Sequence, residues 1–330
     1  MRPSRITARS PSLKTAASNS ATASGTLCLS ASKPPTRDGV GPSCVGLPSG
    51  PWPTLIDFLA ERFPNVTRQT WLERLRRGDV IDEAGQPLTL QQASLAPYPA
   101  NTRLYYYREV PHERLIAFDE VVLHQDEHLL VVDKPHFLPV VPSGGYLTET
   151  VLVRLKRKLG LNDLVPIHRI DRDTAGLVLF SKQPATRAAY SALFAGHRVH
   201  KTYQAIAPWR SDIVFPLTRQ SRIKEAGHFM LQHELPGEVN AITHIDVLAV
   251  RGDLARYQLK PVTGQRHQLR VQMLALGLPI LNDGLYPTLT PEGQIDYAKP
   301  LQLLAKELEF TDPVSGQTQH FVSQRQLMFE

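Results

Sequence analysis

Short strand-like segments dominate the second half of the chain, and their spacing constrains the fold most. They are rich in β-branched and aromatic residues, and they cover residues 176–180, 201–207, 242–250 and 255–262. The connections between them are too short for repeated βαβ units. This spacing favours an α+β fold built on a mainly antiparallel mixed sheet.

Two helices and one further strand are predicted beyond about residue 115. The sequence EHLLVVDKP indicates a strand that ends at Lys134-Pro135, and TETVLVRLKRKLG has the apolar spacing of an amphipathic helix. HQLRVQMLALG predicts a second helix that ends at Gly277. We expect these elements to form one large domain over residues 113–330.

A small N-terminal unit is expected over residues 46–112. TLIDFLAERF and TRQTWLERLRRGDV both have helical apolar spacing, and TRLYYYREV predicts a closing strand. The second helix carries Arg68, Arg74, Arg76 and Arg77. This order resembles the small RNA-binding module first named for a ribosomal small-subunit protein, so we expect an α/β RNA-binding-like unit. An ordinary solvated helix surface is the alternative.

The first 45 residues are rich in Ser, Thr, Ala, Pro and Gly and lack apolar periodicity, which predicts a disordered tail. Residues 1–37 contain six basic residues and no acidic one, a composition that also fits an organelle transit peptide. The formal net charge of the whole chain is +6, so the remainder is neutral. A polyanionic partner must therefore be argued from local clusters.

The remaining composition is that of a globular protein in a reducing compartment. No apolar run approaches the length of a membrane span, and Cys28 and Cys44 are too few for a disulfide framework or a zinc site. We therefore expect a cytoplasmic protein, and a monomer is favoured.

A run of mixed charge, HRIDRD at 168–173, stands directly before the apolar strand at 176–180. Its Asp171 lies between Arg169 and Arg172, and nearby positive charge favours the ionised carboxylate, as a nucleophile or base requires. An ion-paired structural turn is the alternative. A metal site made of His168, Asp171 and Asp173 is disfavoured, because arginines repel a cation.

Two further clusters could carry chemistry. Lys201 and Tyr203 share one face of a predicted strand, although a half-buried structural tyrosine explains that pattern as well. Arg266, His267, Gln268 and Arg270 gather at the start of a predicted helix, where side-chain charge and free backbone amides favour phosphate. A solvated helix end is the alternative there.

Several common chemistries lack their motifs in this sequence. It contains no glycine-rich phosphate loop, G-x-S-x-G, H-E-x-x-H or Cys-x-x-Cys. Nucleotide hydrolysis, serine-hydrolase and zinc chemistry therefore have no support from the sequence.

The clusters together resemble the RluA-like (Rlu-type) RNA pseudouridine synthase family. HRIDRDTAG is similar to the family signature H-R-[LI]-D-x-x-T-[SA]-G, and KTYQA to its K-x-Y-x-A strand. TGQRHQLRVQMLALGLPILNDGLY resembles its T-G-R-x-H-Q-[IL]-R helix with the trailing G-x-P-[IL]-x-G-D. HLLVVDKP and LQLLAKELEFTDP follow two further elements, so the resemblance spans roughly 120–313.

The resemblance implies a pseudouridine synthase fold: a curved mixed sheet with flanking helices and a central RNA-binding cleft, without metal or cofactor. It implies that Asp171 is the catalytic aspartate, that Tyr203 stacks on the uracil and that Arg270 pairs with the aspartate. Five other residues are then expected to bind substrate: His168, Arg169, Lys201, Arg266 and Gln268. The reaction implied is the isomerisation of uridine to pseudouridine in structured ribosomal or transfer RNA, as part of rRNA processing or tRNA modification.

The sequence departs from the family pattern at four positions: Gln265, Gln272, Asn282 and Leu304 stand where Arg, His, Gly and His are usual. None of them is Asp171, Tyr203 or Arg270. A non-catalytic RNA-binding or assembly factor that retains the fold is the alternative function, and a nucleoside hydrolase is a weaker one. The absence of a second acidic cluster counts against the hydrolase.

Overall fold

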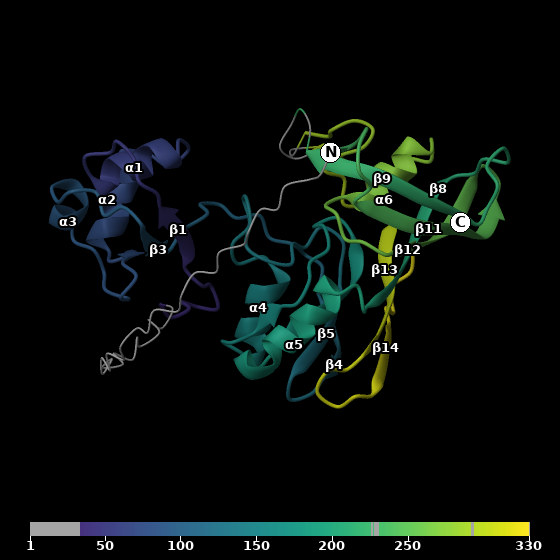
Figure 1. The fold of residues 1–330 in the computed structure, drawn as a ribbon, viewed down its shortest axis with the longest axis horizontal. Helices are drawn as coiled ribbons and strands as arrows, with labels where there is room; N and C mark the ends of the chain where they lie inside the picture. The colour runs from purple at the N-terminus through teal and green to yellow at the C-terminus, as the bar shows by residue number, and fades with distance from the viewer. Residues whose placement is uncertain (1–33, 226, 228–230, 292–293, 330) are drawn as a thin grey trace, which may run out of the picture.

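The computed structural model describes residues 34–225, 227, 231–291 and 294–329. These residues form an N-terminal unit and a larger C-terminal domain, which a linker over residues 108–120 connects (Figure 1). Residues 1–33, including Cys28 and most of the expected tail, lie outside the described residues. Within the part that is described, no helix has the length and apolar content to span a membrane.

The N-terminal unit contains both predicted helices and the predicted closing strand. A three-stranded antiparallel sheet has β3 (Thr102–Tyr106) between β1 (Ser43–Leu47) and β2 (Val80–Ile81). It packs with α1 (Leu55–Arg62), α2 (Arg68–Arg76) and the short α3 (Leu90–Ser94). Helix α2 begins where the Thr67 hydroxyl accepts a hydrogen bond from the Thr70 amide.

The tail boundary expected at residue 45 differs from the structure. β1 begins at Ser43, because residues 43–47 pair with the edge of β3 and satisfy its backbone groups. The preceding residues also have defined partners in both parts of the molecule. Arg37 pairs with Asp79 of the N-terminal unit, whereas the Asp38 carbonyl accepts a 2.9 Å hydrogen bond from Arg157 of the C-terminal domain.

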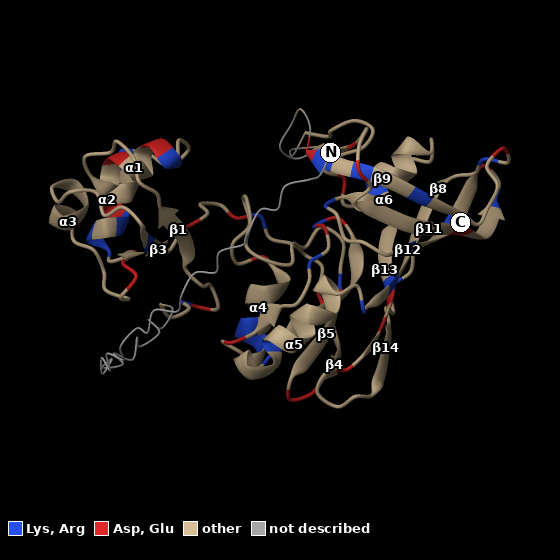
Figure 2. Cartoon of the chain, in the orientation of Figure 1, with Lys and Arg blue, Asp and Glu red and all other residues tan. Residues whose placement is uncertain are grey.

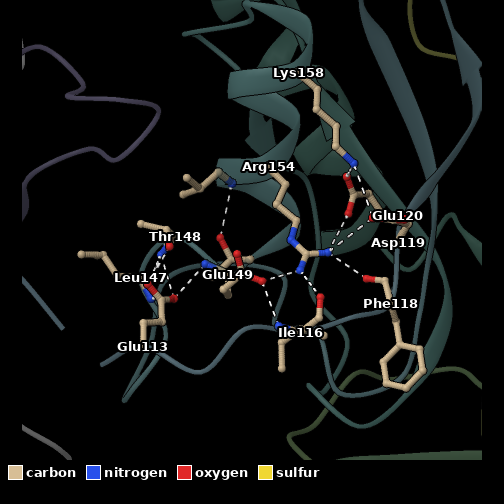
Figure 3. A network of polar contacts seen from close by, with 12 residues as sticks. Glu113, Ile116, Phe118, Asp119, Glu120, Leu147, Thr148, Glu149, Arg154 and Lys158 are labelled. Carbon is tan, nitrogen blue, oxygen red and sulfur yellow. Dashed lines mark hydrogen bonds and ion pairs between the residues drawn. The ribbon is translucent and has the colours of Figure 1, made fainter. Parts of the chain in front are cut away.

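The linker is fixed to the C-terminal domain by two charged side chains (Figure 3). Glu113 accepts hydrogen bonds from the backbone amides of residues 147–149, at 2.6–2.9 Å. Arg154 donates to the carbonyls of Ile116 and Phe118, at 2.5 and 2.8 Å. Without these contacts, the same backbone groups would form hydrogen bonds with water. The linker is therefore anchored to the larger domain before the first strand of that domain.

The C-terminal domain is built on one mixed sheet, as the spacing of the strand-like segments predicts. Its strand order is β10-β9-β11-β12-β8-β13-β7-β5-β4, with β14 beside β13 and β6 beside β7. Among the strand pairs that the structure describes, only β13 with β7 is parallel. The strands on one side of the domain are β4 (Val121–Gln125), β5 (Leu129–Lys134), β6 (Val165–Pro166), β7 (Ala175–Ser181), β13 (Leu303–Thr311) and β14 (Thr318–Val322). Those on the other side are β8 (His200–Pro208), β9 (Leu217–Glu225), β10 (Gln232–Leu235), β11 (Ala241–Arg251) and β12 (Leu254–Pro261).

Three of the helices that the structure describes cover this sheet. α4 (Val151–Leu159) and α5 (Pro184–Ala195) lie against opposite faces of β5 and β7, since they bury alternate residues of those strands. α6 (Gln268–Ala275) covers β8 and β12 through Leu269 and Met273. Every residue of β7 is buried, so the apolar run after the charged segment forms the centre of the core, as its composition suggests.

Candidate active site

The segment that carries Asp171 is the loop between β6 and β7, here called the Asp171 loop (residues 168–174). It leads into Gly176 of β7, whose φ of +109° lies in a region that L side chains rarely adopt. A Cβ atom there would lie 2.2 Å from the Ala305 carbonyl oxygen of β13. Glycine is therefore required for the parallel pairing of β7 with β13, which fixes where the loop emerges.

The sheet register brings Tyr203 to the same level. Ala305 pairs with Gly176 on one side and with Tyr203 of β8 on the other. Burial, together with the negative charge of Asp171, raises the pKa of the Tyr203 phenol above its usual range. The side chain is therefore a neutral aromatic ring beside the carboxylate at physiological pH.

Arg270 of α6 joins two carboxylates. It donates to Asp171 Oδ2 at 3.2 Å and binds Asp283 with two hydrogen bonds, at 2.8 and 2.5 Å. Burial alone would lower the pKa of Arg270, but the Asp283 and Asp171 carboxylates raise it, so the guanidinium stays charged. Arg270 is 1% exposed and Asp171 is 28% exposed, so the aspartate is the member of this group that a substrate can reach.

Two polar side chains, the buried Lys134 and the half-buried His136, hold the backbone of the loop. Lys134 Nζ donates to the Arg172 carbonyl at 2.8 Å, and the Asp173 carbonyl lies 2.7 Å from His136 Nδ1. Burial lowers the pKa of Lys134 to about 7 and that of His136 to about 4. These contacts explain why β5 ends in a lysine, because the Lys134 side chain fixes the backbone next to Asp171.

The arginines next to Asp171 in the sequence have other surroundings. Arg172 binds Asp173 at 2.8 Å, and Arg169 is exposed, with no ion pair among the described residues. From the sequence, these neighbours are the residues expected to place positive charge beside the carboxylate. The structure instead supplies Arg270 from a helix about a hundred residues later, since a charge can be satisfied across the fold as well as along the chain.

Two residues expected to bind substrate have the contacts of structural residues. The His168 ring stacks on Phe194 at 4.5 Å, and its Nε2 accepts the Leu179 amide at 3.1 Å. Gln268 is buried, and its amide group makes four hydrogen bonds, to Thr263, Thr243 and the backbone of residues 242 and 265. Its hydrogen-bonding capacity is thus used within the protein.

Lys201 and Arg266, which were also expected to bind substrate, have different surroundings. Lys201 donates to the Thr263 carbonyl at 3.0 Å, and burial lowers its pKa. It therefore supports the turn that precedes α6. Arg266 is exposed on that turn, 3.9 Å from Glu225, and it remains a candidate for contact with a phosphate.

Two of the departures from the family pattern have a physical explanation. Asn282 has a φ of +60°, a conformation that asparagine tolerates nearly as glycine does, so it can precede Asp283 in the same turn. Gln272 is buried and binds Thr243 at 2.6 Å and Ser221 at 3.0 Å. Its amide group is satisfied where a histidine is usual.

Asp283, which was not among the residues expected to form the site, completes it. It orients Arg270, and it also accepts hydrogen bonds from the backbone amides of Leu285 and Tyr286 at 2.8 and 3.1 Å. The sequence feature that could have identified Asp283 is its position in the trailing motif, directly after the position where glycine is usual.

Within the described residues, no group of three or more His, Cys, Asp or Glu side chains could hold a metal ion.

Basic residues of the domains are spread over α2, α4 and β9, as Figure 2 shows. Those of α4 are largely paired: Arg154 with Glu149, Arg157 with Asp38 and Lys158 with Glu120. Helix α4 therefore offers less positive charge than its sequence suggests.

Comparisons with known proteins agree on one family. A family model described as RNA pseudouridylate synthase matches residues 128–275. An uncharacterized RNA pseudouridine synthase of Synechocystis is 30% identical over 70% of this chain and 79% of its own length. The dual-specificity RNA pseudouridine synthase RluA of Haemophilus influenzae is 33% identical over 61% of this chain and 90% of its own length.

A eukaryotic relative and a solved structure extend the comparison. The mitochondrial tRNA pseudouridine(32) synthase of Saccharomyces cerevisiae is 27% identical over 70% of this chain and 50% of its own length. The structure of human RNA pseudouridylate synthase domain containing 1 has a TM-score of 0.52 at 20% identity, covering 63% of this chain and 84% of that one. The fold is therefore the one that the motifs implied, and the chain belongs to the RluA-like family of RNA pseudouridine synthases.

Proposed function

We propose that Asp171 is the carboxylate that acts on the ribose of a target uridine, and that Arg270 and Tyr203 serve it. The observation that carries this proposal is the Asp171–Arg270–Asp283 arrangement. A guanidinium that is 1% exposed holds one aspartate that is buried and one that solvent reaches. A purely structural ion pair would have no need for the exposed member.

The chemistry of the isomerisation fits these residue types. The N1–C1′ bond breaks, the uracil turns, and a C5–C1′ bond forms while a proton leaves C5 and another is bound at N1. Cleaving the glycosidic bond builds positive character on the sugar, which a carboxylate stabilises or captures. The neutral ring of Tyr203 offers a face on which the detached uracil is kept, since base–aromatic stacking contributes about 1–3 kcal/mol.

RNA contacts around this site are proposed for two exposed cations. Arg169 is on the Asp171 loop and Arg266 is on the turn before α6, so both stand next to residues of the site in the sequence. A uridine within a helix must leave the stack before it can react, and cations on the rim would hold the distorted backbone. His168, Lys201 and Gln268 are assigned to support of the loop and turn.

The target is proposed to be a structured ribosomal or transfer RNA in the cytoplasm. Support for an RNA target comes from the names of two relatives, a dual-specificity RNA pseudouridine synthase and a mitochondrial tRNA pseudouridine(32) synthase. The N-terminal unit is proposed to add an RNA contact, and Arg76 is its best candidate on α2, because it is exposed and no ion pair involves it among the described residues. We expect the protein to act as a monomer.

A single-turnover assay on separated ribosomal and transfer RNA tests this function. The purified protein is mixed in excess with each RNA, and pseudouridine and free uracil are both measured. Pseudouridine in one fraction supports the proposal and names the RNA class. Release of uracil would show a nucleoside hydrolase, and binding without conversion in either fraction would show an assembly factor. Mapping pseudouridine in cells with and without the protein would then locate the uridine.

A further inference from the structure

His267 stands on the other side of the Asp171 carboxylate from Arg270. Arg270 binds Oδ2, whereas His267 Nε2 lies 3.8 Å from Oδ1. The residue precedes the first turn of α6 with a φ of +55°, and its side chain is only 8% exposed. None of the roles given above for the reaction uses this imidazole.

The contacts of its other nitrogen indicate which tautomer is present. His267 Nδ1 lies 2.9 Å from the Tyr286 hydroxyl, and that hydroxyl accepts the backbone amide of Gln232 at 2.8 Å. A tyrosine hydroxyl has one proton to donate. With the Gln232 amide occupying it as an acceptor, the economical arrangement has the hydroxyl donate to Nδ1. Nδ1 then carries no proton, and Nε2 carries one.

This tautomer decides between two roles in the reaction. An Nε2 that already carries a proton cannot take the proton that leaves C5 of the uracil, so His267 is not suited to act as that base. It can donate a hydrogen bond toward Asp171. Burial lowers the pKa of His267, which disfavours the doubly protonated ring and keeps the interaction that of a neutral donor.

We propose that His267 is a positioning residue, which orients the Asp171 carboxylate through Nε2–H, with its tautomer fixed by the Tyr286 hydroxyl and the Gln232 amide. This inference rests on the proposed role of Asp171. The separation of 3.8 Å is longer than a hydrogen bond, and such contacts often shorten only when substrate binds. With Arg270 on Oδ2 and His267 on Oδ1, the plane of the carboxylate is set from both sides.

Matched substitutions separate positioning from packing. The amide nitrogen of glutamine can replace Nε2, whereas asparagine reaches only as far as Nδ1. We expect His267→Gln to keep the single-turnover rate within about tenfold of wild type, and His267→Asn to lower it about a hundredfold, the cost of a small misplacement of a reacting group. RNA affinity should be unchanged in both. His233→Gln, at an exposed histidine of β10, is the control and should behave as wild type.

Nitrogen NMR of the histidine side chains reports which ring nitrogen of His267 carries the proton, a property that a purely packing role would not determine. The proposal predicts a protonated Nε2 and an unprotonated Nδ1 for His267, and a change in that pattern in Tyr286→Phe. A protonated Nδ1 in the wild type would overturn it. Equal rate losses in the glutamine and asparagine variants would also overturn it, because the donor at the Nε2 position would then have no effect.

The single-turnover assay also distinguishes a failure of the His267 proposal from a failure of the role proposed for Asp171. If Asp171→Asn still makes pseudouridine, the role of Asp171 fails, whatever the His267 variants do. If Asp171→Asn is inactive and His267→Asn is as fast as wild type, the positioning role alone fails.

Discussion

Two arginine-rich segments of this chain look alike in the sequence and differ in the structure. The Asp171 loop and helix α2 each place several charged residues within ten positions. In the first, a buried Arg270 from a distant helix completes a compact group around Asp171. In the second, the arginines disperse into separate environments. The difference shows that a functional cluster needs charges arriving from elsewhere in the fold, with at least one of them left accessible.

The arginines of the α2 segment each have different surroundings. Arg74 is buried, with its guanidinium 4.9 Å from the centre of the Trp71 ring. Arg68 binds Asp57 at 2.8 Å, and Arg77 binds Asp79 at 2.8 Å. The four arginines that the sequence places close together therefore do not share one exposed surface, because the aliphatic stem and guanidinium of Arg74 fill the core beside the tryptophan. Arg76 is the exposed one without an ion pair in the described structure.

Replacing Arg270 should have the largest effect on stability. Arg270→Met leaves Asp283 buried without its partner, and breaking a buried pair in this way costs about 3–5 kcal/mol. Denaturant unfolding measures this loss. The double variant Arg270→Met/Asp283→Asn should regain part of the stability and none of the activity. An Arg270→Met protein that unfolds at the wild-type denaturant concentration would show that the compact group does not carry the stability of the site.

The next effect is a dependence of stability on pH that arises from His168, the first residue of the Asp171 loop. Burial lowers the pKa of His168 to about 3, while an unfolded histidine has a pKa of about 6.5. Between these values the unfolded chain binds more protons, so stability is lost as the pH falls. From pH 7 to pH 5 the loss from this residue is about 2 kcal/mol. His168→Gln should remove that part of the loss in urea unfolding, and His233→Gln should not. A pH dependence that is the same in His168→Gln and wild type would place His168 in contact with solvent.

A matched pair of variants tests whether Arg76, and not the buried Arg74, contacts RNA. Arg76→Gln should weaken RNA binding and reduce the slope of log affinity against log salt by about one, the effect of one lost phosphate contact. Arg74→Met should leave the slope unchanged, and it should leave stability unchanged or raise it, since a well-packed apolar side chain often replaces a buried charge without loss. Filter-binding titrations across salt concentrations give both slopes. If Arg74→Met reduced the slope instead, Arg74 would be reaching RNA and the account of α2 would fail.

The sequence predicted the elements whose patterns are local. The apolar run before Ser181, the alternation in β8, β11 and β12 and the spacing in α4 and α6 all indicated the observed elements. β1 and the segment from residue 34 were not predicted, because few apolar residues mark them and their partners lie far along the chain.

The candidate site was predictable only in part for the same physical reason. Motif resemblance marked Asp171, Tyr203 and Arg270, and these are the residues that the structure gathers. Asp283 and His267 both lie in the motif segment that resembles the family helix, but the pairing of Asp283 with Arg270 and the approach of His267 to Asp171 depend on the folded chain, which the motif alone does not specify. Gln268 looked available at a helix start, but its hydrogen bonds to β11 and the preceding turn occupy it.

The role of Asp171 is tested by comparing wild type with Asp171→Asn and Asp171→Ala in a single-turnover assay on the target RNA. We expect wild type to make pseudouridine, and both variants to bind the RNA with unchanged affinity and to lose on the order of 10⁴-fold in rate or more. Their thermal unfolding should stay close to wild type, since the Asp171 side chain is partly exposed. Pseudouridine formation by either variant at a rate near wild type would show that Asp171 is not the reacting carboxylate.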